Sequence, residues 1–60
     1  MHTIFEVLDL NHVPHSFEFT GQPYQVRDEF LRYARRRDVA VVTVWNADGI
    51  REFYCDNTGR

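Results

Sequence analysis

The 60-residue chain contains no lysine, only one cysteine, two prolines and three glycines. A single cysteine excludes an intramolecular disulfide framework, so the chain must fold without that cross-link. No apolar run approaches the ~18 residues that span a bilayer, and no signal peptide is visible. These absences predict one small domain over residues 1–60 that is cytoplasmic and does not associate with a membrane.

The charged residues exclude two further classes of protein. Seven arginines and nine acidic residues give a net charge of −2, which favours neither a polybasic nucleic-acid binder nor an acidic tail. Because every side-chain cation other than histidine is a planar guanidinium, bidentate contacts with carboxylates or phosphates are favoured. Apolar residues make up 43% of the chain and aromatic residues 15%, which is enough for one small core.

Two segments near the start of the chain predict a β-hairpin. Residues 3–9 (TIFEVLD) are rich in β-branched and aromatic side chains, which favours a strand. Residues 16–20 (SFEFT) alternate, with Phe17 and Phe19 on one face. Pro14 lies between these segments and cannot donate a hydrogen bond to a strand ladder. We therefore expect strands over 3–9 and 16–20, joined by a loop.

The pattern changes to a helical period after Pro23, a residue that suits the first turn of a helix. Val26, Phe30 and Ala34 fall on one stripe at 100° per residue, which is typical of an amphipathic helix. Acidic residues near the start and arginines near the end complement the helix dipole. The spacing predicts a helix over 24–37.

A second hairpin follows the helix. Residues 39–46 (VAVVTVWN) form a nearly continuous apolar run, and residues 50–55 (IREFYC) return as the last strand. The turn between them places Gly49 where the left-handed backbone region is needed. Residues 56–60 are polar, and we expect a frayed tail.

The predicted fold is α+β with element order β-β-α-β-β, in which one helix covers one face of a four-stranded mixed sheet. A right-handed crossover through the helix predicts that the first and last strands are central and parallel, with the third strand at an edge. The residues expected to face the helix are Phe5, Val7, Phe17, Phe19, Val42, Val44, Phe53 and Cys55, opposite Val26, Phe30 and Ala34.

Part of the chain resembles a known family. Residues 30–34 (FLRYA), followed by a strand that carries Trp45 and a turn that contains Asp48, are similar to the small immunoglobulin-binding β-grasp domains. The resemblance covers the plan of nearly the whole chain and implies a β-grasp-like fold. Because no diagnostic motif is shared, antibody binding is not implied.

Histidine and cysteine are the residues with the most chemical potential. If the first and last strands are parallel, His12, His15 and Cys55 lie at one end of the sheet with Asp56, where a tetrahedral zinc site is conceivable. The spacing favours the alternative of two exposed loop histidines and a half-buried thiol. A Cys–His nucleophile would need an orienting group and a cleft. We therefore expect no bound metal, no cofactor and no catalysis.

The face of the sheet away from the helix carries the main functional prediction. It would hold Ile4, Leu8, Val41, Trp45, Ile50 and Tyr54, more apolar side chains than a solvated face should have. The alternative is a register shift by one residue, which would turn Trp45 inward. We predict that a partner contact centres on Trp45 and Tyr54, because aromatic residues and arginine dominate binding energy. Its predicted rim is Arg32, Arg35, Arg36, Glu18, Glu52 and Asp48. The third strand, as an unguarded edge, would also be able to pair with a partner strand.

These features favour a small non-catalytic protein-binding module. We expect a phage or mobile-element inhibitor or modulator that covers a functional surface of a host or defence enzyme, in the cytoplasm of the host cell. Residues 15–18 (HSFE), followed by a helix and a strand, resemble a short phage inhibitor of host RNA polymerase, without implying a target. One alternative is a nucleic-acid-binding regulator that uses the cluster Arg32–Arg37. Another is a small structural subunit or a homodimer.

Overall fold

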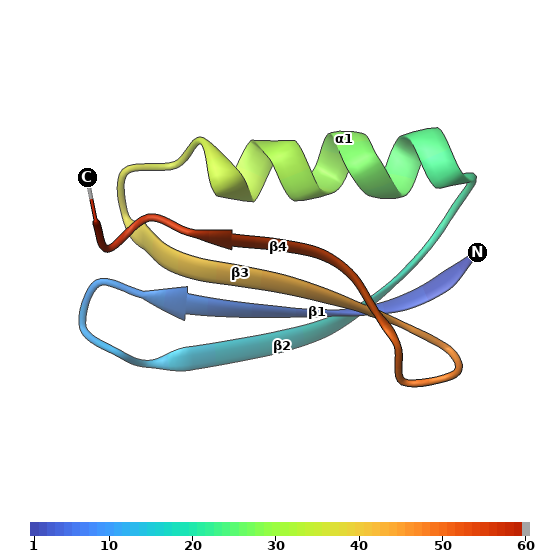
Figure 1. Cartoon of the computed structure of the whole chain (residues 1–60), viewed down its shortest axis with the longest axis horizontal. Helices are drawn as coiled ribbons and strands as arrows, with labels where there is room; N and C mark the ends of the chain where they lie inside the picture. Colours follow the sequence, from blue (N-terminus) through green and yellow to red (C-terminus); the bar gives the residue numbers. More distant parts are fainter. Residues whose placement is uncertain (60) are drawn as a thin grey trace.

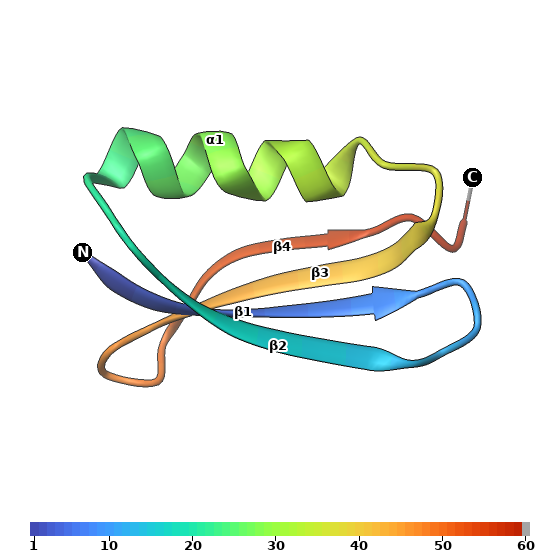
Figure 2. The ribbon, with the colours of Figure 1, turned by 180° about the vertical axis from the view of Figure 1, so that it is seen from behind.

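The computed structural model describes residues 1–59 and contains one sheet with one helix on a single face (Figures 1 and 2). The elements in chain order are β1 (His2–Asp9), β2 (Pro14–Thr20), α1 (Pro23–Ala34), β3 (Val39–Asn46) and β4 (Arg51–Asp56). The predicted α+β class and the element order β-β-α-β-β are confirmed. β2 begins two residues earlier than predicted, at Pro14, because this strand lies at a sheet edge where a missing N–H need not break a ladder.

The order of the strands differs from the prediction. The sheet runs β2-β1-β3-β4, and each neighbouring pair is antiparallel. The expected mixed sheet with adjacent first and last strands is therefore wrong, and the strand order is not the β-grasp-like one that we predicted. β3 lies in the interior of the sheet and β4 lies at an edge.

The composition of the two strands explains this order. β3 is apolar on both faces, which suits a strand with neighbours on both sides. β4 exposes Arg51, Glu52 and Asp56, and charged side chains protect a sheet edge from pairing with other chains. The crossover rule sets the hand of the connection through α1 but not the number of strands that it spans.

The predicted inward-facing residues are confirmed as the core. Phe5, Val26, Val42 and Val44 are fully buried and belong to one cluster with Phe30 and Ala34. Aromatic pairs join the helix and both halves of the sheet. Phe30 of α1 stacks on Phe53 of β4 with ring centroids 5.0 Å apart. The ring centroids of Phe5 and Phe17, on β1 and β2, lie 5.1 Å apart.

The helix ends three residues before the predicted limit, at Ala34. The side-chain amide of Asn57 donates hydrogen bonds to the carbonyl oxygens of Ala34 and Val39, at 3.0 and 3.2 Å. These bonds satisfy a carbonyl group at the helix end and hold the start of β3 against it. Arg36, two residues beyond the end of the helix, donates hydrogen bonds to Asp38.

The prediction of a frayed tail over 56–60 is wrong for its first two residues, Asp56 and Asn57. The backbone N–H of Asn57 donates to the carbonyl oxygen of Ala40 at 2.7 Å, and β4 itself extends to Asp56. The Cys55 thiol donates to the side-chain oxygen of Asn57 at 3.2 Å. Residues 56 and 57 are therefore part of the folded structure, while Arg60 lies outside the described residues.

The two hairpins share one turn geometry. A residue in the left-handed region closes each turn, His12 with φ +62° and Gly49 with φ +77°. The N–H of each donates to a carbonyl three residues earlier, that of Asp9 or Asn46, at 3.0 Å. The side chains of Asp9 and Asn46 each accept two backbone N–H groups of their own turn. The prediction for Gly49 is confirmed, and His12 occupies the equivalent position with a side chain.

Candidate functional site

The face of the sheet opposite the helix, which we call the outer face, gathers the predicted aromatic residues. Ile4 of β1 lies directly opposite Trp45 of β3, and Tyr54 of β4 lies opposite Thr43. Residues directly opposite on neighbouring strands share a face, and Thr43 and Trp45 are two positions apart on β3. Trp45 and Tyr54 therefore lie on the same outer face, as predicted.

The helix leaves the outer face of the sheet uncovered (Figures 1 and 2), and the side chains on this face are largely apolar. Half of the surface of Tyr54 is exposed, and the guanidinium of Arg51 lies over its ring at 4.8 Å. Four apolar side chains of the outer face on β1 and β3 are half-buried: Ile4, Leu8, Val41 and Trp45. Neighbouring side chains shield them, because no second layer within residues 1–59 covers this face. A single-layer face of this composition is suited to contact with another macromolecule.

Trp45 carries an unsatisfied polar group. Its indole Nε1 is buried beneath neighbouring atoms, and no acceptor within residues 1–59 meets it. Native structures rarely leave such a group without a partner, because each costs about 1–3 kcal/mol. The indole is therefore not held in place by a polar contact of its own in the described part of the chain.

The charges on the outer face are mostly negative. Glu6, Glu18 and Asp56 lie on this face by register, against the single guanidinium of Arg51. His2 approaches Glu18 at 3.9 Å. A hollow of about 400 Å³ lies beside Glu6, and its wall is formed by Glu6, Val7, Leu8, Pro14, Ser16, Val41 and Thr43. The outer face is therefore apolar with an acidic character.

The predicted rim of the contact is only partly assembled. Glu18 lies on the outer face, whereas Glu52 is at the edge and accepts a hydrogen bond from the Asn46 amide at 2.7 Å. Asp48 lies in the turn before β4. The arginines of the predicted rim belong to the helix or its C-terminal end, across the sheet from Trp45: Arg32, Arg35 and Arg36. The structure therefore does not place the arginines around the aromatic centre.

The predicted strand pairing through the third strand is wrong. β3 is paired on one side with β1 and on the other with β4, so its backbone groups are already used. The free edges of the sheet belong to β2 and β4.

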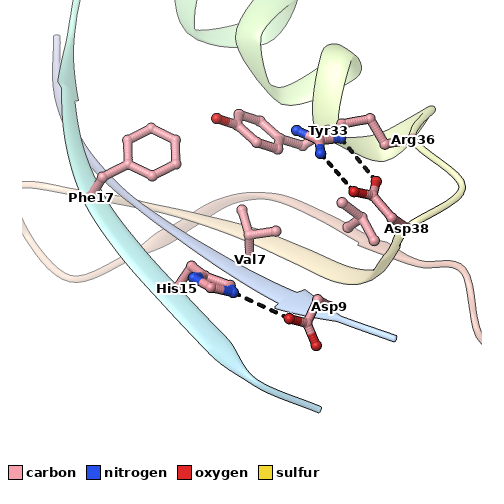
Figure 3. A pocket seen from close by; sticks show the side chains of 8 residues that line it. Val7, Asp9, His15, Phe17, Tyr33, Arg36 and Asp38 are labelled. Atoms are coloured by element: carbon pink, nitrogen blue, oxygen red, sulfur yellow. Dashed lines mark hydrogen bonds and ion pairs between the residues drawn. The ribbon is translucent and has the colours of Figure 1, made fainter. Parts of the chain in front are cut away.

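A second hollow lies on the helix side, between the end of α1 and the first hairpin (Figure 3). Two hydrogen-bonded pairs face each other across it. His15 Nε2 lies 3.2 Å from an Asp9 carboxylate oxygen. Arg36 donates two hydrogen bonds to Asp38, at 2.9 and 2.6 Å, and its guanidinium lies 5.7 Å from the centre of the Tyr33 ring.

The carboxylates of this hollow are stabilised within the chain. The N–H of Val13 lowers the pKa of Asp9 most, with further lowering by His15, while partial desolvation opposes both. The hydrogen bonds from Arg36 lower the pKa of Asp38 in the same way. Because these charges already have partners, the hollow has less to offer a ligand than the outer face. Each pair is local in the sequence, but sequence reasoning missed the hollow, because only the tertiary fold brings the end of the first hairpin and the segment after α1 together.

The residues considered for a metal do not converge. Cys55 lies on the inward face of β4 and contacts the core, whereas His15 lies on the far edge strand and pairs with Asp9. No group of three histidine, cysteine or acidic side chains among residues 1–59 is arranged to hold a metal ion. His12 is exposed in the first turn.

Comparison with models of protein families, with curated proteins and with solved structures found no match to this chain. Within residues 1–59, no helix is both long enough and apolar enough to cross a membrane. What the chain does must therefore be inferred from its own geometry and chemistry.

Proposed function

We propose that this chain is a non-catalytic protein-binding module that acts as an inhibitor or modulator by covering a functional surface of another protein. The observation that carries the proposal is the uncovered outer face, on which Trp45 and Tyr54 lie diagonally to each other on neighbouring strands. Large aromatic side chains supply most of the binding energy in protein interfaces. The exposed ring of Tyr54 also carries a hydroxyl group that can hydrogen-bond to a partner.

The rest of the chain supports a binding role over a catalytic one. The only thiol, on Cys55, faces the core and donates to Asn57, so neither His12 nor His15 is placed to activate it. The small size and acidic charge of the chain favour a phage or mobile-element origin with a host or defence enzyme as the target. That origin is part of the proposal.

The proposal is tested by affinity capture with two matched variants. The full chain is immobilised as wild type, as Tyr54→Arg and as Tyr24→Arg, and exposed to lysate of the source organism or its host. Tyr24 is the control, because it is as exposed as Tyr54 but lies on the helix, across the sheet. We expect a protein that the wild type and Tyr24→Arg capture and that Tyr54→Arg loses. Capture that survives Tyr54→Arg but not Tyr24→Arg would contradict the proposal.

A second candidate function is nucleic-acid binding through the cluster Arg32–Arg37. Arg35 and Arg37 form no ion pair within residues 1–59, which leaves them able to contact phosphate. Such binding should weaken steeply as salt rises, because phosphate contacts release counterions. A titration of the chain with short DNA and RNA duplexes at low salt decides the matter, and no detectable binding there would remove this candidate.

A third possibility is that a second copy of the chain covers the outer face. Sedimentation equilibrium at micromolar concentrations tests it. If the wild type and Tyr54→Arg both have the mass of a monomer, a homodimer through the outer face is excluded.

A further inference from the structure

One carboxylate occupies the centre of the outer face. Glu6 lies on β1, an interior strand, with Thr43 of β3 opposite on one side and Ser16 of β2 on the other. Ile4 and Leu8 flank it on its own strand, and both are half-buried. Glu6 is therefore surrounded by the residues that a docked partner would cover.

The Glu6 carboxylate is free to accept a new partner. The side chain is exposed, and no ion pair or hydrogen bond within residues 1–59 involves it. The hollow beside it has an apolar wall formed by Leu8, Pro14 and Val41. A long side chain with an apolar stem and a polar end fits such a wall, since lysine and arginine bury their stems and keep the charge at a polar site.

Covering the outer face takes Glu6 out of water. Burying a carboxylate without a counter-charge is strongly unfavourable, and a cation placed against it offsets that cost. A partner that lacks the cation would leave the carboxylate unpaired and is therefore disfavoured. We infer that the partner of the outer face presents a lysine or arginine side chain that lies along Leu8 and Val41 and pairs with Glu6. This inference rests on the proposed function and names the chemistry of the partner surface: apolar, with one central cation.

The charges of the outer face disfavour two other occupants. In a face-to-face dimer, each copy would bring three acids of the outer face, Glu6, Glu18 and Asp56, against one guanidinium, that of Arg51, so the interface would hold an excess of negative charge. Nucleic acid carries a dense negative charge, so the acidic outer face repels it. A basic protein surface is the occupant that the charges favour.

Random peptides displayed as a library provide a probe that works before the natural partner is identified. The library is selected on the immobilised full chain, and individual recovered peptides are synthesised for affinity measurement. Peptides that lose binding to Tyr54→Arg but keep it to Tyr24→Arg are those that dock on the outer face. We expect these peptides to carry lysine or arginine among apolar residues.

The decisive comparison uses Glu6→Gln with Glu18→Gln as its control, because both changes remove one carboxylate from the outer face, one at its centre and one on the edge strand β2. Affinity for outer-face peptides should fall at least about tenfold in Glu6→Gln and much less in Glu18→Gln. Replacing the peptide's cation should cause the same loss on the wild type and little further loss on Glu6→Gln.

Two outcomes separate the inference from the function on which it rests. Outer-face peptides with no preference for a cation, or with equal affinity for Glu6→Gln, would overturn the inference and leave the docking face standing. A selection that recovers no peptide sensitive to Tyr54→Arg would overturn the docking face itself, and the inference with it.

Discussion

The two hairpin turns place His12 and Gly49 at equivalent positions, so exchanging a side chain for glycine at one and glycine for a side chain at the other should change the stability in opposite directions. His12 and Gly49 close their hairpins with φ +62° and φ +77°, in turns with the same hydrogen bonds. A residue with a Cβ loses about 1–2 kcal/mol in this backbone region, while glycine does not. Glycine in turn costs about 0.4–1 kcal/mol because it makes the unfolded chain more flexible. His12→Gly should therefore stabilise the chain by roughly 0.5–1 kcal/mol.

Gly49→Ala should reverse the sign by a similar amount. A Cβ at Gly49 meets no atom within 4 Å, so the cost comes from the backbone angle and not from a clash. Gly59 is the control, because its Cβ position is also open and no left-handed φ is found there. Gly59→Ala should leave the stability unchanged or slightly raised.

Thermal unfolding followed by circular dichroism measures all three variants. One kcal/mol corresponds to about 4–8 °C in a chain of this size, so His12→Gly should melt a few degrees above the wild type and Gly49→Ala a few degrees below it. A lower melting temperature for His12→Gly, or an unchanged one for Gly49→Ala, would refute the equivalence of the two turns.

The tail, the core, the ion pairs and the outer face each allow a further prediction. Asn57→Ala should lower the free energy of unfolding by roughly 1–3 kcal/mol in urea titrations, because carbonyl groups at the helix end lose their donor. Phe30→Asp should leave the chain unfolded by circular dichroism, since it buries a charge in the core. Asp9 and Asp38 have pKa values below the ordinary 3.8, so their stabilising contribution is complete above about pH 4 and is lost as the pH falls further. Urea titrations across this range should show a falling free energy of unfolding, and a constant value down to about pH 2 would contradict the prediction. Trp45→Ala should weaken partner affinity by about 2 kcal/mol or more in calorimetry and lower the stability of the free chain by less.

Local patterns explain which parts of the fold were predictable. Apolar side chains at a regular spacing indicate which face of an element is buried. The structure buries the predicted faces, namely the helical stripe of Val26, Phe30 and Ala34 and the strand face of Phe17 and Phe19. The strand order was not predictable from connections alone, because a hairpin permits the last strand on either side of the third. The charges of β4 and the apolar character of β3 on both faces do hold that information, since exposed charges belong at an edge.

The candidate site was predictable only in its centre. Register places Trp45 and Tyr54 together because both strands of the second hairpin were correctly located, with a bulge near Trp45. The arginines were assigned to the rim of that site although the helix lies on the other face of the sheet in the predicted fold and in the structure alike, because their charge was considered without their position. The role of Asn57 had no local signal, because its hydrogen bonds reach residues 18 and 23 positions earlier.

Binding of a protein partner to the outer face can be observed through the single tryptophan. Trp45 is the only residue with an indole N–H, so nuclear magnetic resonance of the nitrogen-15-labelled chain shows one such signal. On addition of the captured partner, we predict that this signal shifts together with the amides of Ile4, Glu6 and Tyr54, while those of Arg35 and Arg36 stay in place. Shifts confined to the arginines at the end of the helix, with the indole signal unmoved, would contradict binding through the outer face.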